Sequence, residues 1–284
     1  MKVSIIGSGI SGLSLGCYLQ MNGYETEIYE KNSLPGGLCA SWKQGEFTFD
    51  GCLHWILGSG NASSFYKLWS ELLDMKSIEF VHHEVRVSIE LKENCNKYNN
   101  KVFRLYTNVD RLKAYLLDLA PEDKSMIMSI IRLIRVMQKY DMPPLIENIP
   151  QLQSLRNKMA LITYLPFIFQ MLKWKNVTNY SFARRLKTPF LKEAFQFLYA
   201  GEEVNLFVMT MPLAFYDKKS AGYPMGGSAR FAKRIADKYE SLGGKIQYRK
   251  EIKKIIVRDD VARGLLLNDG TDVYSDITIS TADW

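Results

Sequence analysis

Cysteine and histidine are scarce in this sequence of 284 residues, which contains four cysteines and three histidines. No two cysteines have the C-x-x-C spacing, and zinc sites draw their ligands from clusters of these two residue types. We therefore expect no metal site. The scarcity also argues against a disulfide scaffold. Cys17, Cys39, Cys52 and Cys95 are interpreted as free thiols in a reducing compartment, which indicates a cytoplasmic protein.

Long apolar runs are also missing. No stretch reaches the roughly 18 residues that a membrane-spanning helix needs. The apolar segment near the amino terminus is interrupted by four glycines between residues 7 and 16, which argues against a secretory signal.

Charge is only mildly unbalanced, with 37 Lys and Arg against 30 Asp and Glu, a net charge of +7. Such an excess is compatible with a membrane surface or a phosphorylated cofactor. We expect no nucleic-acid binding, because the basic residues at 184–187 are not interleaved with aromatic side chains on a shared face. Hydrophobic residues make up 47% of the chain, which is typical of a globular protein of about two domains.

A glycine-rich motif follows the first predicted strand. Residues 2–6 are short, β-branched and bounded by glycine, as in a buried parallel strand. The next six residues have the G-x-G-x-x-G spacing, in the order Gly7, Ser8, Gly9, Ile10, Ser11 and Gly12. Apolar spacing predicts a helix over residues 11–22, and a second predicted strand over residues 25–29 ends at Glu30.

This order of elements predicts a dinucleotide site. Gly7 allows a tight turn, Gly9 lets the backbone approach a pyrophosphate, and Gly12 lets the helix pack closely on the strand. The amino end of the helix attracts phosphate. Glu30 lies 18 residues after Gly12 and is placed to accept hydrogen bonds from a ribose. Its charge would repel a 2′-phosphate, so the ligand is predicted to be FAD or NAD.

Two further blocks accompany the motif. After Glu30 and Lys31 come the pair Gly36-Gly37 and an F-D-x-G-like stretch at residues 47–51. The second block begins Tyr223-Pro224-Met225-Gly226-Gly227-Ser228 and continues as a predicted helix to residue 242 and strands over 251–255 and 276–282. Together these segments resemble the flavoprotein amine oxidase and phytoene desaturase superfamily. They are most similar to its carotenoid desaturase, carotenoid isomerase and retinol saturase branch.

The resemblance implies an α/β fold with FAD as cofactor. It implies a Rossmann-like FAD-binding domain at residues 1–78 and 212–284, and an inserted α+β, mainly helical, substrate domain at 79–211. Gly36 and Gly37 would lie along the ribityl and pyrophosphate groups, the Gly226-Gly227 turn near the flavin ring, and the backbone of Ile252 beside the adenine. Superfamily members often have arginine where this chain has Leu38, and backbone N–H groups with Lys31 would serve instead.

Superfamily members are usually longer and return to the cofactor domain with a final strand and helix. The resemblance therefore implies a carboxy-terminally short chain. We expect such a chain to bind FAD poorly by itself and to self-associate through exposed apolar surface.

The middle of the chain is predicted to form the insertion. Alternation predicts strands over residues 80–91 and 101–107, joined by a polar turn at 93–100, and two helices between 108 and 140 separated at Pro121. Neighbouring side chains of a strand face opposite ways, so His82 and His83 are not predicted to share a metal. His54 is a candidate for a polar group near the flavin, or a structural residue, and no other catalytic residue is identified.

The insertion contains 14 uncharged residues at 159–172, followed by Lys173, Trp174 and Lys175. The segment 159–175 is predicted either to be a buried helix or to anchor the protein peripherally on a membrane. Aromatic residues of the insertion are predicted to form its core or to line a tunnel for a lipophilic substrate: Tyr164, Phe167, Phe169, Trp174, Phe195, Phe197, Tyr199, Phe207 and Phe215.

These observations predict an FAD-dependent oxidoreductase that transfers hydride between a polyene or isoprenoid-like substrate and the flavin. Flavin carries such chemistry, so the protein needs to position the substrate and exclude water. The alternatives are a flavin amine or porphyrinogen oxidase, a flavin-dependent isomerase without net redox change, and a truncated nucleotide-binding remnant without activity.

Overall fold

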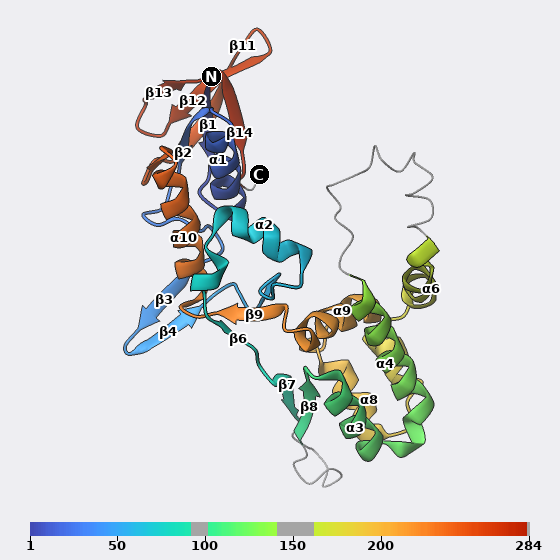
Figure 1. Ribbon diagram of the computed structural model, residues 1–284. Coiled ribbons are helices and arrows are strands. Elements are labelled where there is room, and N and C mark those ends of the chain that lie inside the picture. The colour runs from blue at the N-terminus through green and yellow to red at the C-terminus, as the bar shows by residue number, and fades with distance from the viewer. Residues whose placement is uncertain (92–101, 141–161, 283–284) are drawn as a thin grey trace. The chain divides into compact units, whose positions relative to one another are not determined.

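The computed structural model describes residues 1–91, 102–140 and 162–282 (Figure 1). The chain forms two compact units. The first consists of Met1–Ile56, Lys67–Val81 and Tyr223–Trp284, and the second of Leu57–Tyr66 and His82–Gly222. The sequence placed the changes of unit after residues 78 and 211, whereas in the structure they fall after residues 81 and 222, and residues 57–66 also belong to the second unit. Residue 211 lies inside helix α9 (Leu206–Asp217), which belongs wholly to the second unit.

A four-stranded sheet forms the centre of the first unit. Its order is β10 (Lys245–Gln247), β2 (Glu25–Tyr29), β1 (Lys2–Ile6) and β14 (Ile277–Ser280), and all neighbours are parallel. Val3 and Ile5 of β1 are fully buried, as expected for a parallel strand that is covered on both faces. The strands predicted over residues 2–6 and 25–29 are confirmed.

Helices α1 (Ile10–Met21) and α10 (Gly227–Ser241) pack against each other at a glycine. A Cβ added to Gly16 of α1 would lie 2.7 Å from the ring of Tyr239 in α10. The Tyr239 hydroxyl also shares a 2.8 Å hydrogen bond with Thr26 of β2, which joins α10 to the sheet. The first helix was predicted from apolar spacing, and the second from the block that carries the resemblance.

Smaller elements complete the first unit. They are the hairpin β3 (Ser41–Gln44) and β4 (Phe47–Asp50), the 3-10 turn η1 (Met75–Ser77), and the antiparallel sheet β11 (Ile252–Arg258), β12 (Val261–Leu267) and β13 (Asp272–Tyr274). The short strand β6 (Phe80–Val81) pairs with β9 (Ala221–Pro224) through Phe80 and Pro224. Boundaries between the two units fall within β9, within β5 (Ile56–Leu57) and within α2 (Ser64–Leu72).

The second unit is mainly helical. Its helices are α3 (Val109–Leu119), α4 (Lys124–Lys139), α6 (Leu165–Trp174), α7 (Asn179–Ala183), α8 (Pro189–Phe197) and α9, with the turn η2 (Pro121–Asp123) between α3 and α4. The predicted break at Pro121 is confirmed. A hairpin pairs β7 (Val85–Glu90) with β8 (Val102–Tyr106). The single strand predicted over 80–91 is wrong, because the pairing stops after Val81 and resumes at Val85. The turn predicted at 93–100 lies outside the described residues.

Aromatic and aliphatic side chains form the core of the second unit. Leu112, Leu133 and Ile134 are almost fully buried there, and Trp174 and Phe195 belong to the same cluster. Phe182 packs against both of these aromatic rings, at centroid distances of 6.1 and 5.2 Å. Among the aromatic residues singled out in the sequence, Trp174, Phe195 and Phe215 are therefore core residues, whereas Phe169 and Phe197 are exposed.

Candidate nucleotide-binding site

The glycine motif forms the turn between β1 and α1. Gly7 has a φ of +94°, which favours glycine, and its N–H donates to the Tyr29 carbonyl at 2.9 Å. Gly9 precedes the helix in an extended conformation, with φ −65° and ψ 173°. It has no side chain to cap the first turn of α1, whose N–H groups have no partner within the helix. This turn presents the amino end of α1 as an anion site.

The second and third glycines of the motif differ in what surrounds them. A Cβ added to Gly12 would lie 2.0 Å from the Gly7 carbonyl oxygen and 2.8 Å from the Thr281 Oγ1, so packing within the chain requires glycine there. A Cβ added to Gly9 would meet no atom within 4 Å. The space beside Gly9 is therefore free for a bound group.

The predicted glycine pair lies directly on this turn. The Gly36 N–H donates to the Ser8 carbonyl at 2.8 Å, and Gly36 and Gly9 form a parallel bridge. A Cβ on Gly37 would lie 3.2 Å from the Gly9 Cα. Two backbone segments thus approach each other where the pyrophosphate was predicted. Lys31 and Leu38 are exposed, Leu38 with 83% of its surface accessible.

Glu30 directly follows β2 and is buried, with 4% of its surface exposed. Its Oε2 accepts hydrogen bonds from the Ser8 N–H at 2.8 Å and the Ser8 hydroxyl at 2.7 Å. Its Oε1 accepts from the N–H and the side-chain amide of Asn32, both at 2.8 Å. Burial raises the pKa of this carboxyl, but the hydrogen bonds from Asn32 and Ser8 outweigh it, so the net pKa is lowered and the charge is retained.

Glu30 therefore holds the glycine turn through Ser8. A ribose hydroxyl would have to share an oxygen that already accepts two bonds. The sequence did not single out Asn32, whose backbone and side chain both donate to this carboxylate.

The predicted adenine side also lies beside Glu30. The Lys250 N–H donates to the Glu30 carbonyl at 2.8 Å, two residues before Ile252 begins β11. Ile252 packs against a buried cluster that contains Tyr29 and Leu265. The structure thus brings Ile252 close to the end of β2.

The Gly226-Gly227 turn is held by a carboxylate that the sequence did not single out. Asp50, the last residue of β4, accepts hydrogen bonds from the Ser228 N–H at 2.7 Å and the Tyr223 hydroxyl at 2.8 Å. It also accepts from the Ser228 hydroxyl. A Cβ on Gly227 would lie 2.5 Å from the Asp50 Oδ2, and φ at Gly226 and Gly227 is +95° and +75°.

Hydrogen bonding also fixes the charge states in this cluster, which we name the Asp50 cluster (Asp50, Tyr223 and Ser228). Burial raises the pKa of Asp50, but the bonds from Ser228 and Tyr223 outweigh it and the net pKa is lowered. Burial and the bond to Asp50 raise the pKa of Tyr223 to about 12. At neutral pH the cluster is one carboxylate with neutral hydroxyl donors.

His54, the predicted candidate near the flavin, is exposed on a bend of the first unit.

Comparison with known proteins agrees with this geometry. Residues 5–72 match the family of NAD(P)-binding Rossmann-like domains. The fold is a Rossmann-like dinucleotide-binding fold. A crystal structure of an oxidoreductase from Methanosarcina mazei shares it, with a TM-score of 0.58, 21% sequence identity, and coverage of 99% of this chain and 58% of that one. The predicted fold class is confirmed.

Two curated relatives align along almost the whole chain. A protein named inactive all-trans-retinol 13,14-reductase from Danio rerio is 22% identical over 296 residues, covering 99% of this chain and 47% of the relative. Phytoene desaturase from Fusarium fujikuroi is 24% identical over 302 residues, covering 99% and 49%. The chain thus spans about half the length of these relatives. The predicted resemblance to the phytoene desaturase and retinol saturase branch is confirmed.

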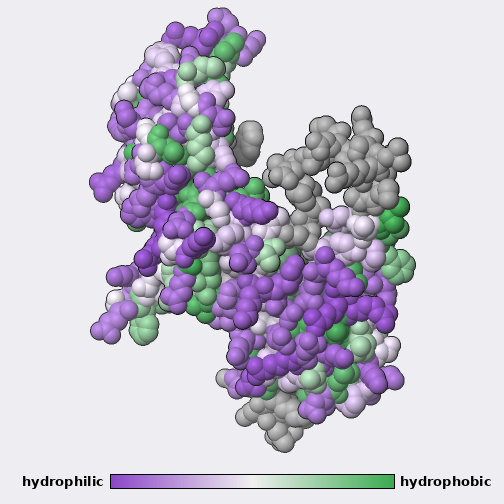
Figure 2. Space-filling model, viewed as in Figure 1, coloured by the Kyte–Doolittle hydropathy of each residue, from purple (hydrophilic) through white to green (hydrophobic). Residues whose placement is uncertain are grey.

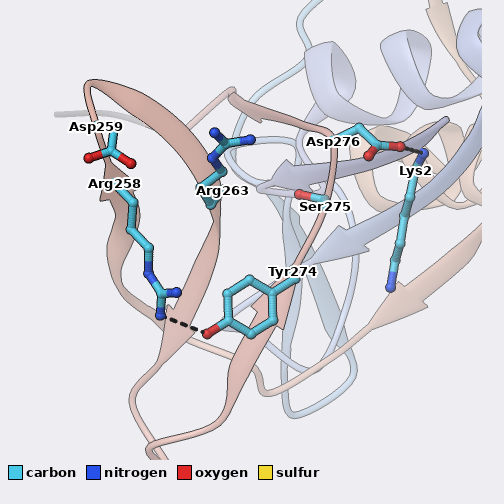
Figure 3. A pocket seen from close by; sticks show the side chains of 7 residues that line it. All are labelled: Lys2, Arg258, Asp259, Arg263, Tyr274, Ser275 and Asp276. Carbon is cyan, nitrogen blue, oxygen red and sulfur yellow. Dashed lines mark hydrogen bonds between the residues drawn. The ribbon is translucent and has the colours of Figure 1, made fainter.

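A surface pocket of about 470 Å³ lies elsewhere in the first unit, which we call the Rossmann-like unit because it contains the parallel sheet and the glycine turn (Figure 3). It is lined by Lys2, Arg258, Asp259, Arg263, Tyr274, Ser275 and Asp276. Arg258 donates to the Tyr274 hydroxyl at 3.2 Å, and the Lys2 N–H donates to Asp276 at 2.7 Å. None of the predicted cofactor residues lines this pocket, so the glycine turn and not the pocket is the candidate site.

Over residues 1–91, 102–140 and 162–282, no group of three His, Cys, Asp or Glu side chains is arranged to hold a metal ion. Within the same described ranges, no helix has the length and apolar character needed to cross a membrane.

We expect Asp50→Asn to lower the free energy of unfolding by about 1–3 kcal/mol, the range for hydrogen bonds to a charged group. The matched control is Asp237→Asn on α10, since Asp237 forms an exposed ion pair with Lys233 and its substitution should cost less than about 0.5 kcal/mol. Urea unfolding of the variants measures both. Equal effects would contradict the role given to Asp50.

The effect of Asp50→Asn should depend on pH. The pKa of Asp50 is lower in the folded than in the unfolded protein. The stability that its carboxylate contributes is therefore complete above the unfolded pKa of about 3.9 and is lost as the pH falls through the folded pKa. The difference in the free energy of unfolding between wild type and Asp50→Asn should therefore be constant from about pH 5 to about pH 8 and shrink below about pH 4.

Proposed function

We propose that the chain is an FAD-dependent oxidoreductase that transfers hydride between a lipophilic substrate and flavin. The observation that carries the proposal is the free space beside Gly9, framed by the amino end of α1, by Gly37 and by the Glu30 carboxylate. A dinucleotide pyrophosphate needs these features: close backbone approach, N–H donors and an acid at the ribose.

The residues present fit FAD. Gly7, Ser8, Gly9, Ile10, Ser11 and Gly12 form the phosphate turn, Glu30 and Ile252 border the adenosine, and Gly36 and Gly37 close over the turn. Gly226 and Gly227 would lie on the flavin side, held by Asp50. FAD, when bound, supplies the hydride acceptor and donor. The charged Glu30 disfavours the 2′-phosphate of NADP.

The substrate class is proposed from the relatives, whose names refer to phytoene and all-trans-retinol. Both names denote lipophilic polyenes, so we propose a lipophilic polyene or isoprenoid-like substrate. Within the chain, the contribution of the protein is to bind cofactor and substrate and to exclude water from the reacting atoms.

Anaerobic flavin reduction tests the reaction. FAD-loaded protein is mixed with a carotenoid polyene in detergent micelles or, in parallel, with a polyamine, and the flavin absorbance is followed. Bleaching by the polyene alone supports the proposal. Bleaching by the polyamine alone would favour an amine oxidase, and double-bond isomerisation without bleaching would favour an isomerase.

We also propose that the protein is cytoplasmic and contacts membranes peripherally through helix α6. Leu165, Phe169 and Leu172 of α6, together with Ile162 just before it, are spaced at helical intervals and are 54% to 65% exposed. Figure 2 shows apolar side chains at the surface over α6. Lys173 and Lys175 follow this apolar face and would lie near anionic headgroups. Residues 159–161 of the predicted anchor lie outside the described residues.

Not every apolar residue of α6 belongs to this face. Trp174 is buried, and Phe167 packs against Tyr140 and Phe207 at centroid distances of 5.6 Å each. Substitution of Phe167 would therefore disturb the core of the second unit. Phe169 and Leu172 are the informative positions.

We expect wild-type protein to float with liposomes containing anionic lipid, and Phe169→Glu/Leu172→Glu to lose most of this binding. Two charges replace apolar area that would be inserted between headgroups. The control is Val208→Glu, an exposed apolar position on α9. Flotation that is absent in wild type, or equal in all three proteins, would contradict membrane contact through α6.

A further inference from the structure

Two cysteines of the Rossmann-like unit lie side by side. The sulfur atoms of Cys39 and Cys52 are 3.6 Å apart, within thiol hydrogen-bond distance, although 13 residues separate them in sequence. Both thiols are free in the structure. Neither residue belongs to the glycine turn or to the Asp50 cluster.

The hairpin β3–β4 explains why they meet. Its register places Ser41 opposite Asp50, and the Gly51 N–H donates to the Ala40 carbonyl at 3.0 Å. Continued by two residues beyond the last strand pair, this register places Cys39 opposite Cys52. The two positions therefore face each other just beyond the open end of the hairpin.

The type of pairing suits a covalent bond. Pairs of an antiparallel ladder alternate between hydrogen-bonded and non-hydrogen-bonded, and the latter have Cα atoms about 4.5 Å apart. The Gly51 N–H donates to the Ala40 carbonyl, whereas the Ala40 N–H turns to the Leu38 carbonyl. The pair Ala40 and Gly51 thus keeps one bond of a hydrogen-bonded pair, and the next pair along the ladder is of the second type. The N–H groups of Cys39 and Cys52 donate instead to the Gly36 carbonyl and to the Asp50 side chain. A Cα separation near 4.5 Å lies within the range of disulfides.

We propose that Cys39 and Cys52 form a reversible disulfide, so that this pair is a thiol-oxidation site of the protein. The inference rests on the hairpin register and the sulfur contact, and it stands whether or not the chain binds FAD.

The reaction needs a disulfide oxidant such as oxidised glutathione. Cys52 is half-buried and Cys39 is 7% exposed, so the Cys52 thiolate attacks first and one glutathione leaves as its thiol. Cys39 then loses its proton and attacks the Cys52 sulfur, and the second glutathione leaves as its thiol. One protein disulfide forms, two hydrogen atoms pass to glutathione, and one glutathione disulfide is reduced.

The surroundings make the second step pH-dependent. In the reduced pair, burial, the hydrogen bond with Cys52 and the charge of Asp50 raise the pKa of the Cys39 thiol to about 12. Once Cys52 is bound to glutathione, burial and the charge of Asp50 still raise this pKa. Cys39 is therefore almost entirely protonated at neutral pH, and closure of the disulfide should accelerate as the pH rises.

The bond would join two parts of the candidate site. Cys39 is hydrogen-bonded to Gly36 of the glycine pair, at 2.9 Å, and Cys52 follows Asp50, which holds the start of α10. Oxidation would tie the loop that carries the glycine pair to the end of β4.

The experiment equilibrates the full chain with oxidised and reduced glutathione in different ratios, traps free thiols with an alkylating agent and maps the peptides by mass spectrometry. We expect a Cys39–Cys52 linked peptide in oxidising buffer, lost again on reduction. Cys17 is fully buried against the Ile235 carbonyl, so its thiol should react with the alkylating agent only after the protein is unfolded. Cys95→Ser is the matched control and should not change the linked peptide.

Two results would overturn the proposal. One is that both thiols stay free at the most oxidising ratio. The other is that Cys52 accumulates as a stable mixed disulfide with glutathione, while no linked peptide forms. Because the peptides come from wild-type protein, neither result depends on whether a cysteine variant folds.

Discussion

Gly12→Ala should abolish the stable fold of the Rossmann-like unit, with a loss of at least about 3 kcal/mol in the free energy of unfolding. The added methyl group would lie 2.0 Å from the Gly7 carbonyl oxygen, a backbone atom that cannot turn aside. Relief requires α1 to move away from β1, which would also disturb its contact with α10. Soluble yield and urea unfolding measure the effect.

Gly9→Ala is the matched control for this variant. Gly9 lies in the same turn but has an ordinary extended conformation, and its Cβ would meet no atom within 4 Å. We expect its free energy of unfolding to stay within about 0.5 kcal/mol of wild type. Equal stability of Gly12→Ala and Gly9→Ala would show that the helix and turn are not packed as described.

Gly9→Val should bind FAD at least about 100-fold more weakly than wild type, which corresponds to about 2.7 kcal/mol. The valine side chain would occupy the space beside the turn and keep the pyrophosphate from the amino end of α1. Because the extended backbone of Gly9 accepts a β-branched residue, the loss should occur without a change in thermal unfolding.

Flavin fluorescence during titration measures this loss, and Gly9→Ala should fall between wild type and Gly9→Val. If Gly9→Val protein purified with a full complement of FAD, the glycine turn would not be the cofactor site. Unfolding of Gly9→Val would instead show that the space beside Gly9 is needed by the chain itself.

The glycine turn could be predicted because its determinants are local. Strand, glycines, helix and Glu30 follow each other within 29 residues, and each glycine has a conformational or packing reason that the sequence order reveals. The same local logic located Pro121 between two helices. The structure adds that the Gly9 and Gly36 backbones are bridged.

The Asp50 cluster could not be predicted in the same way. Tyr223 is 173 residues from Asp50, so their hydrogen bond depends on how β9 and the β3–β4 hairpin pack together. The sequence identified both segments but contained no signal that they touch. The break between β6 and β7 was missed for a similar reason, since strand pairing and not apolar alternation sets where a strand ends.

Equilibrium dialysis of the chain against FAD, FMN, NAD and NADP is the most direct test of the proposed site. The described residues would hold the adenosine and pyrophosphate, which FMN lacks, and Glu30 would exclude the 2′-phosphate of NADP. We predict that FAD is retained best and that FMN and NADP are retained least. Tightest retention of NADP, or retention of FMN equal to that of FAD, would contradict the account.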